Sequence, residues 1–155
     1  MLKGQQIVKN RAGIIKLLNQ AAATELEAAY YYRYLSYYAS GLHGRQVAST
    51  FSEMAEGEWR HVGELMDRIF QLGGKPFDKV AQAEKNAFSK GPPIPKKAND
   101  WKAMLKSALR MEQDAIDFYR GCMDDVHEDP VTLHLLREIL EDEVGDESTL
   151  AALLD

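Results

Sequence analysis

The sequence predicts an all-α protein, a bundle of four long helices arranged as two antiparallel hairpins joined by a long crossover. Glycine and proline cluster in a few short places, and the stretches between these clusters are long enough for helices. Within them the apolar residues recur at steps of three and four, the period of one helix face. No segment alternates apolar and polar residues over the length of a strand. With 155 residues, 45% of them apolar, the chain can form a single domain with a packed core.

Local signals set the helix boundaries. Helices are expected at about residues 6–40, 45–72, 100–127 and 130–153, with a crossover over residues 73–99, all in a single domain, 1–155. Gly73 and Gly74 end the second helix, because glycine adopts the left-handed conformation of helix C-termini. Asp129 followed by Pro130 starts the fourth, since a capping carboxylate precedes a proline in the first turn. Two short turns and one long connection are typical of paired hairpins.

The crossover differs in composition from the helices. A short helix can form from Phe77 to Ala87, but the proline-rich stretch 91–95 cannot be helical. Asn99 or Asp100 then caps the third helix. Because the sequence stops at Asp155, directly after the fourth helix, we expect no fifth helix.

Composition excludes several classes of protein. The single cysteine, Cys122, rules out an internal disulfide framework and a multi-cysteine zinc site. The first residues lack the pattern of a signal peptide, and no uncharged apolar run reaches 18 residues, so we expect a cytoplasmic protein without membrane contact. The net charge is −5 and no block of lysine and arginine stands at either end, so nucleic acid is not expected as a partner.

Each predicted helix carries an acidic residue where its apolar stripe should continue. The interrupting residues are Glu25 in the first helix, Glu58 and His61 in the second, Glu112 in the third, and Glu143 with Asp146 in the fourth. One such acid alone is more often a surface residue. Four acids in phase, one per helix, predict carboxylates that converge in the core, where burial without a partner costs several kcal/mol each.

A pair of divalent cations would make this convergence tolerable. The nearby arginines are out of phase with the stripes and cannot easily neutralise the cluster; they are Arg33, Arg60, Arg110 and Arg137. Many carboxylates, few imidazoles and no thiolate suit iron or manganese better than zinc or copper. Glu58 and His61 can hold one ion together, because residues three apart on a helix are neighbours.

Four segments carry a resemblance to a known family. They are ATELEAAYYYRY (23–34), EGEWRHVGELMDRIFQLGGKPFD (56–78), RMEQDAIDFY (110–119) and ILEDEVGDESTL (139–150). Together they resemble the ferritin-like superfamily, most closely bacterioferritins and small bacterioferritin-like or Dps-like cages. The resemblance implies a di-iron ferroxidase centre within one subunit, with manganese as an alternative metal. It also implies Fe(II) and dioxygen or peroxide as partners, for iron storage or detoxification in a homo-oligomeric cage.

The resemblance also assigns roles to residues. Glu58 and Glu143 would bridge the two metals, Glu25 and Glu112 would each hold one from the side, and His61 would complete the first position.

One further residue, Tyr32, matches a tyrosine that the family keeps beside the centre. It would act there either as an electron donor or only in core packing.

The chain departs from the family pattern at Asp146, where the second Glu-x-x-His would need a histidine. Asp146 can ligate directly, act through a water, or leave the task to Glu147. Weaker binding at the second position, slower oxidation or a preference for manganese would follow.

Two further departures concern haem and assembly. Trp59 replaces the methionine that haem-binding bacterioferritins place after the second-helix glutamate, so haem is not expected. Without a fifth helix, a smaller cage is favoured, a dodecamer above all. Several acids stand at the junction of the third and fourth predicted helices: Asp124, Asp125, Glu128 and Asp129. They form either an outward patch for cations or an ordinary solvated run of charges.

Two other functions remain open on the same bundle. One is a di-metal peroxidase or catalase without a storage role. The other is a DNA-protecting Dps-type cage whose metal site is weakened by the Asp146 change, against which the lack of a basic tail argues.

Overall fold

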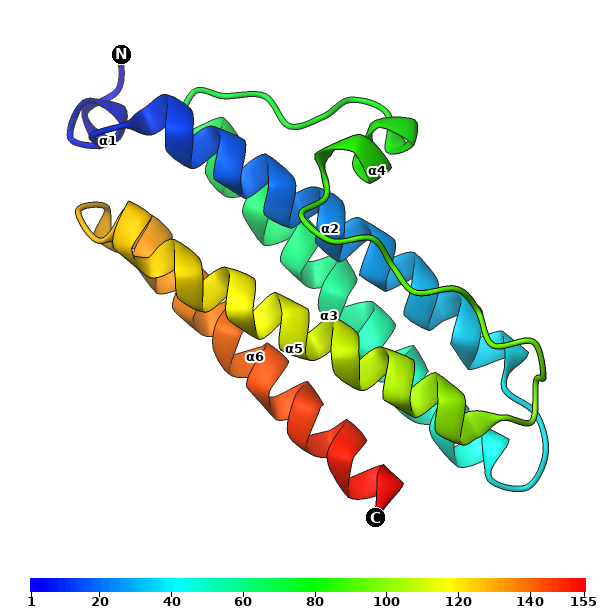
Figure 1. Cartoon of the computed structure of the whole chain (residues 1–155). Coiled ribbons are helices and arrows are strands. Elements are labelled where there is room, and N and C mark those ends of the chain that lie inside the picture. The colour runs from blue at the N-terminus through cyan, green and yellow to red at the C-terminus, as the bar shows by residue number, and fades with distance from the viewer.

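Two helical hairpins lie side by side in the computed structural model, which describes residues 1–155 (Figure 1). The first hairpin pairs α2 (Arg11–Tyr38) with α3 (Gly44–Gln71), and the second pairs α5 (Trp101–Val126) with α6 (Pro130–Leu154). The backbones approach most closely within each hairpin, whereas the two hairpins meet through their side chains. The structure is all-helical, as the sequence predicts, and none of its helices combines the length and apolar character needed to span a membrane.

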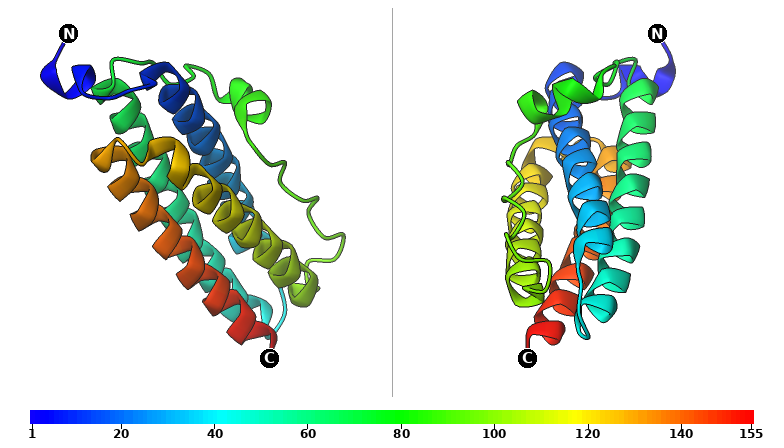
Figure 2. Two further views of the ribbon diagram at one scale, coloured as in Figure 1. Left: turned by 60° about the vertical axis from the view of Figure 1, so that its left-hand side comes forward. Right: turned by 90° about the vertical axis from the view of Figure 1, so that its right-hand side faces the viewer.

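A long crossover joins the hairpins and runs along the outside of the bundle (Figure 2). The expected helix of the crossover is formed only in part, by a 3-10 turn at Val80–Gln82 followed by α4 (Ala83–Asn86). The segment after α4 is extended and is bound to α2, since Thr24 Oγ1 accepts a hydrogen bond of 2.9 Å from the backbone of Phe88. The crossover therefore covers the outer side of α2 and reaches the start of α5.

The N-terminal boundary of the first long helix differs from the prediction. A continuous helix from residue 6 is wrong: the chain forms α1 (Lys3–Gln6), breaks, and begins α2 only at Arg11. Asn10 adopts φ +49°, in the left-handed region that asparagine tolerates better than most residues, and this ends any continuity with α1. Gly73, at φ +76°, ends α3 as predicted.

Both predicted N-caps of the second hairpin are present. Asp100 accepts a hydrogen bond of 3.1 Å from the backbone of Ala103, at the start of α5. Asp129 accepts bonds of 3.2 and 3.3 Å from Val131 and Thr132, at the start of α6. These caps satisfy amides that a helix start otherwise leaves without partners.

Asp129 is buried, which corrects the expectation that it belongs to an outward acidic patch. Arg68 of α3 donates to both of its carboxylate oxygens, at 2.8 and 3.1 Å, and to Thr132 at 2.9 Å. Burial alone would raise the pKa of Asp129, but the bonds from Thr132 and Arg68 hold it below its ordinary value. This ion pair fastens α3 to the turn between α5 and α6.

The apolar core is divided into two clusters, one toward each end of the bundle. One end holds Val8, Ile14, Leu18, Ala21, Ala22, Leu65, Ile69, Leu72, Tyr119, Cys122, Val126, Leu136 and Ile139. The other holds Ala28, Tyr31, Tyr32, Leu35, Val47, Phe51, Met54, Ala55, Met104, Leu105, Ala108 and Leu150. The residues between the clusters along each helix are the acidic ones described next.

Candidate metal centre

Four glutamates, one from each long helix, meet in the layer between the two apolar clusters. Glu25, Glu58, Glu112 and Glu143 are all at most 2% exposed. Each lies in phase with the apolar stripe of its own helix, so the packing that buries the stripe also buries the carboxylate. We call these residues, together with His61 and Asp146, the metal centre.

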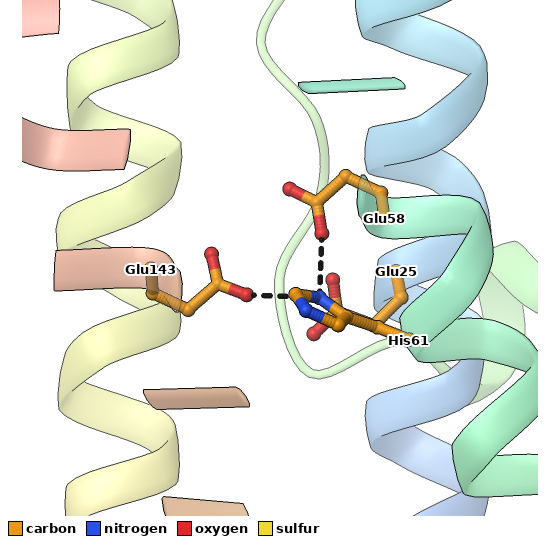
Figure 3. Close-up of side chains that lie close together, drawn as sticks. All are labelled: Glu25, Glu58, His61 and Glu143. Carbon is orange, nitrogen blue, oxygen red and sulfur yellow. Dashed lines mark hydrogen bonds and ion pairs between the residues drawn. The ribbon is translucent and has the colours of Figure 1, made fainter. Parts of the chain in front are cut away.

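The centre offers two positions for a cation. Ligand atoms of Glu25, Glu58, His61 and Glu143 all lie within 4.8 Å of one another and form the first position. Figure 3 shows these side chains, with Glu58 and Glu143 directed at His61 from different helices. Nδ1 of His61 lies 3.2 Å from Glu58 and 3.3 Å from Glu143.

The second position consists only of oxygen ligands. It is formed by Glu58, Glu112 and Asp146, whose ligand atoms also lie within 4.8 Å of one another. Glu58 belongs to both positions, as a bridging ligand would, whereas Glu143, also expected to bridge, belongs only to the first. Glu147, the other residue considered for this position, instead accepts a hydrogen bond of 3.0 Å from Gln113.

The electrostatics of the centre are unfavourable without a cation. Burial first, and then the charges of the neighbouring glutamates, raises the pKa of Glu58 well above its ordinary value and that of Glu143 to about 8. Burial also raises the pKa of Glu112, and Glu143 adds to that shift. No lysine or arginine forms an ion pair with any of the four glutamates, and Oε2 of Glu112 is buried without a hydrogen-bond partner. A buried carboxylate oxygen without a partner is available to bind a cation.

Two buried tyrosines donate hydrogen bonds to Glu25 and Glu112, which we call the outer glutamates because each belongs to only one of the two cation positions. The hydroxyl of Tyr32 on α2 donates to Glu112 on α5, and the hydroxyl of Tyr119 on α5 donates to Glu25 on α2. The family resemblance points to Tyr32 but not to Tyr119, which lies in phase with the apolar residues of its own helix. The signal that could have found it is a spacing: each tyrosine follows a centre glutamate of its own helix by seven residues.

A second residue of the site that the sequence did not predict is Asp142. Its Oδ2 atom lies 3.0 Å from Nε2 of His61 and accepts a bond of 2.6 Å from Arg60. When Nε2 donates to this carboxylate, Nδ1 keeps its lone pair for a cation, an arrangement that orients histidine ligands in many metal sites. The sequence gives no sign of this contact, because it joins two helices and follows no periodic pattern.

The arrangement suits a pair of hard or borderline divalent cations. Carboxylates can chelate, bridge or bind through one oxygen, and a shared glutamate places the two positions side by side. The first position adds one imidazole, whereas the second has none. The donor set therefore fits iron or manganese at both positions, with the second the more oxygen-rich.

Comparisons with known proteins agree with this geometry. A profile described as the ferritin-like domain matches residues 15–155. The chain is 28% identical over 142 residues to the DNA protection during starvation protein of Pyrococcus furiosus, covering 91% of this chain and 76% of that protein. It is also 28% identical over 135 residues to a bacterioferritin of Desulfovibrio desulfuricans, covering 86% of this chain and 69% of the bacterioferritin.

Solved structures show the same architecture. A bacterioferritin-related protein from Bacteroides fragilis, described as a dodecameric thioferritin, matches with a TM-score of 0.89 at 26% identity. That match covers 97% of this chain and 89% of the other. Dps from Thermosynechococcus elongatus shares the fold, with a TM-score of 0.86 at 18% identity over 93% of this chain and 91% of its own.

Proposed function

Because the chain belongs to the ferritin-like domain family, we propose that it is a ferroxidase that oxidises Fe(II) with dioxygen or peroxide at the metal centre. The observation that supports this most directly is the pair of adjacent cation positions sharing Glu58. Fe(II) bound there would give up one electron per ion to the oxidant. The buried glutamates would hold both ions at a fixed spacing and compensate their charge.

The residues of the centre have distinct roles in this proposal. Glu25 and His61 would bind only the first ion, and Glu112 and Asp146 only the second. Glu58, assisted by Glu143, would bridge them. Because the carboxyl groups of Glu58, Glu112 and Glu143 have raised pKa values, they would release protons as the ions bind, so binding strengthens as the pH rises.

Tyr32 and Tyr119 would hold the outer glutamates in place, and Tyr32 would serve as an electron donor to the oxidant. Both side chains are fully buried and each is bonded to a ligand of the centre. We propose that the product is stored in a homo-oligomeric cage, with a dodecamer favoured. The dodecameric thioferritin of B. fragilis, which shares the fold, supports this assembly.

A second candidate function is a manganese peroxidase or catalase, favoured by the all-oxygen second position. Release of oxygen from peroxide by manganese-loaded protein would identify it. Iron-loaded protein that oxidises Fe(II) without such release would instead support the ferroxidase.

Anaerobic titration with Fe(II), followed by exposure to oxygen, tests the main proposal. Two ions per chain should bind and be oxidised, because the centre has two positions. Glu58→Gln should lose this activity while keeping its helical circular dichroism. The matched control is Glu64→Gln, on the same helix, whose side chain is 44% exposed. If the wild-type protein binds no Fe(II) saturably, the proposal is wrong.

A further inference from the structure

The two sides of the metal centre differ in their access to solvent. Between α2 and α5 the crossover closes the bundle, and only a cavity of about 30 Å³ remains next to Glu25 and Glu112. Phe88 and Lys90 of the crossover line this cavity, and Phe88 stacks on Phe118 of α5 with ring centroids 3.7 Å apart. A cation approaching from this side would meet an aromatic ring and an ammonium group as well as the carboxylate of Glu27.

Between α3 and α6 the centre borders a much larger groove, of about 680 Å³. Its lining is polar except for Met54. His61 from α3 and Asp146 from α6 lie on its inner side, so the groove reaches ligands of both cation positions. We call it the α3/α6 groove.

Two glycines line the α3/α6 groove beside the centre. Gly57 directly precedes Glu58, and Gly145 directly precedes Asp146. A Cβ atom added at either glycine would meet no other atom within 4 Å. Both glycines lie inside regular helices, where glycine lowers helix stability relative to alanine, so the open space comes at a cost in local stability.

The charges along the α3/α6 groove favour a cation. Five carboxylates line it, those of Glu53, Glu56, Glu141, Asp142 and Asp146, whereas Arg60 is the one lining residue that is an arginine or a lysine. Glu56 is paired with Arg33 and Asp142 with Arg60. The other three acids form no ion pair, which leaves net negative charge along the path to Asp146.

A second observation shows what this path leads to. Asp146, on the inner side of the groove, shares the second cation position with Glu112, whose Oε2 atom is buried and has no partner. We infer that the α3/α6 groove is the route by which divalent cations enter the metal centre, and that they reach the Asp146 position first. The inference rests on the proposed function for the identity of the cation as Fe(II). The route itself would be open to any divalent cation.

Blocking the groove tests the route. Gly57→Leu places a side chain in the open space without removing a ligand, and Gly63→Leu, on the exposed surface of the same helix, is the matched control. Stopped-flow absorbance should show Co(II) entering Gly57→Leu about tenfold more slowly than the wild type, with the final number of bound ions unchanged. Gly63→Leu should bind at the wild-type rate.

A variant that removes charge from the groove provides a second test if Gly57→Leu folds poorly. The double change Glu53→Gln and Glu141→Gln should slow Co(II) entry about threefold or more at low salt and weaken its dependence on ionic strength. As a control, Asp114→Asn with Asp117→Asn removes the same charge from exposed positions of α5 outside the groove. If the groove variants bind at the wild-type rate, or if Phe88→Ala accelerates entry, the inference is wrong.

The two proposals fail separately. Co(II) undergoes no oxidation in this assay, so its rate of entry reports the route even if the protein proves not to oxidise Fe(II). If Fe(II) is oxidised at equal rates in the wild type and Gly57→Leu while Co(II) entry is also unchanged, the ferroxidase stands and the route is excluded.

Discussion

Tyr119 of the second hairpin donates its hydroxyl hydrogen bond to Glu25 of the first. Tyr32 of the first hairpin does the same for Glu112 of the second. Each hairpin thus positions a carboxylate that belongs to the other, and the geometry of the metal centre depends on how the two hairpins are docked.

Removing one of these hydroxyl groups should weaken cation binding. Tyr119→Phe keeps the ring in the core but leaves Glu25 without its hydrogen-bond donor. We therefore expect the affinity for Co(II) to fall by about tenfold, as is typical when a residue that hydrogen-bonds to a metal ligand is removed. Calorimetric titration would measure it. Tyr31→Phe is the control, because the buried hydroxyl of Tyr31 contacts none of the four glutamates. Equal affinities in both variants would rule out the positioning role.

Stability without cations should fall as the pH rises. The carboxyl groups of Glu58, Glu112 and Glu143 have pKa values above the ordinary 4.5, that of Glu143 reaching about 8. Below pH 4.5 they are protonated in both states; above it the unfolded chain loses protons that the folded one retains, so the free energy of unfolding decreases up to about pH 8. In EDTA, Tm should drop by at least about 5 °C between pH 5 and pH 8.

Manganese should reverse this pH dependence, because cations bind the deprotonated carboxylates and only in the folded protein. Glu143→Gln has no carboxyl group to ionise at this position, so it should weaken the dependence of Tm on pH in the cation-free protein. A Tm that rises over the same range in EDTA would contradict the buried, unpaired state of these groups.

Replacing Asp146 by histidine should strengthen the second cation position. The change completes a second Glu-x-x-His pair with Glu143, and an imidazole favours Co(II) and Fe(II) more than a further carboxylate does. Titration with Co(II) should then show two steps of similar affinity, whereas the wild type should show a tighter and a weaker one. Asp146→Ala should retain the first step and lose the second. If Asp146→Ala binds two ions as tightly as the wild type, Asp146 is not a ligand.

The buried pair of Arg68 and Asp129 makes a separate prediction about stability. Asp129→Ala removes an N-cap and leaves the guanidinium group without its carboxylate, so unfolding free energy should fall by about 3–5 kcal/mol. Urea denaturation followed by circular dichroism would measure the loss. Glu128→Ala, one residue away and paired only at the surface with Lys9, should change stability little. A similar loss in both variants would mean that the buried pair has no special role.

Helical periodicity made most of the centre predictable from the sequence. A carboxylate in phase with an apolar stripe must point where the stripe points, so Glu25, Glu58, Glu112 and Glu143 could be placed in the core before any coordinates. The same rule did not reveal the role of Tyr119, because an aromatic residue in an apolar stripe is predicted only to pack in the core.

Contacts between distant segments were not predictable in this way. Asp129 was expected in solvent, because nothing in its neighbourhood shows that Arg68 of another helix reaches it. Asp142 meets His61 through the docking of α6 on α3, which periodicity within one helix does not encode. The break at Asn10 depends on a single residue in the left-handed conformation. The amphipathic pattern continues past this residue and therefore does not reveal the break.

The division of the apolar core into two clusters has a consequence for folding. The layer between them holds carboxylates that repel one another, so in the absence of metal the middle of the bundle is its weakest cross-section. Each end can then loosen without the other, and backbone amides near Glu58 would exchange with deuterium ahead of those at Leu65 or Phe51. A bound ion would join four helices at that level, so loading the protein would turn two weakly linked halves into one cooperative unit.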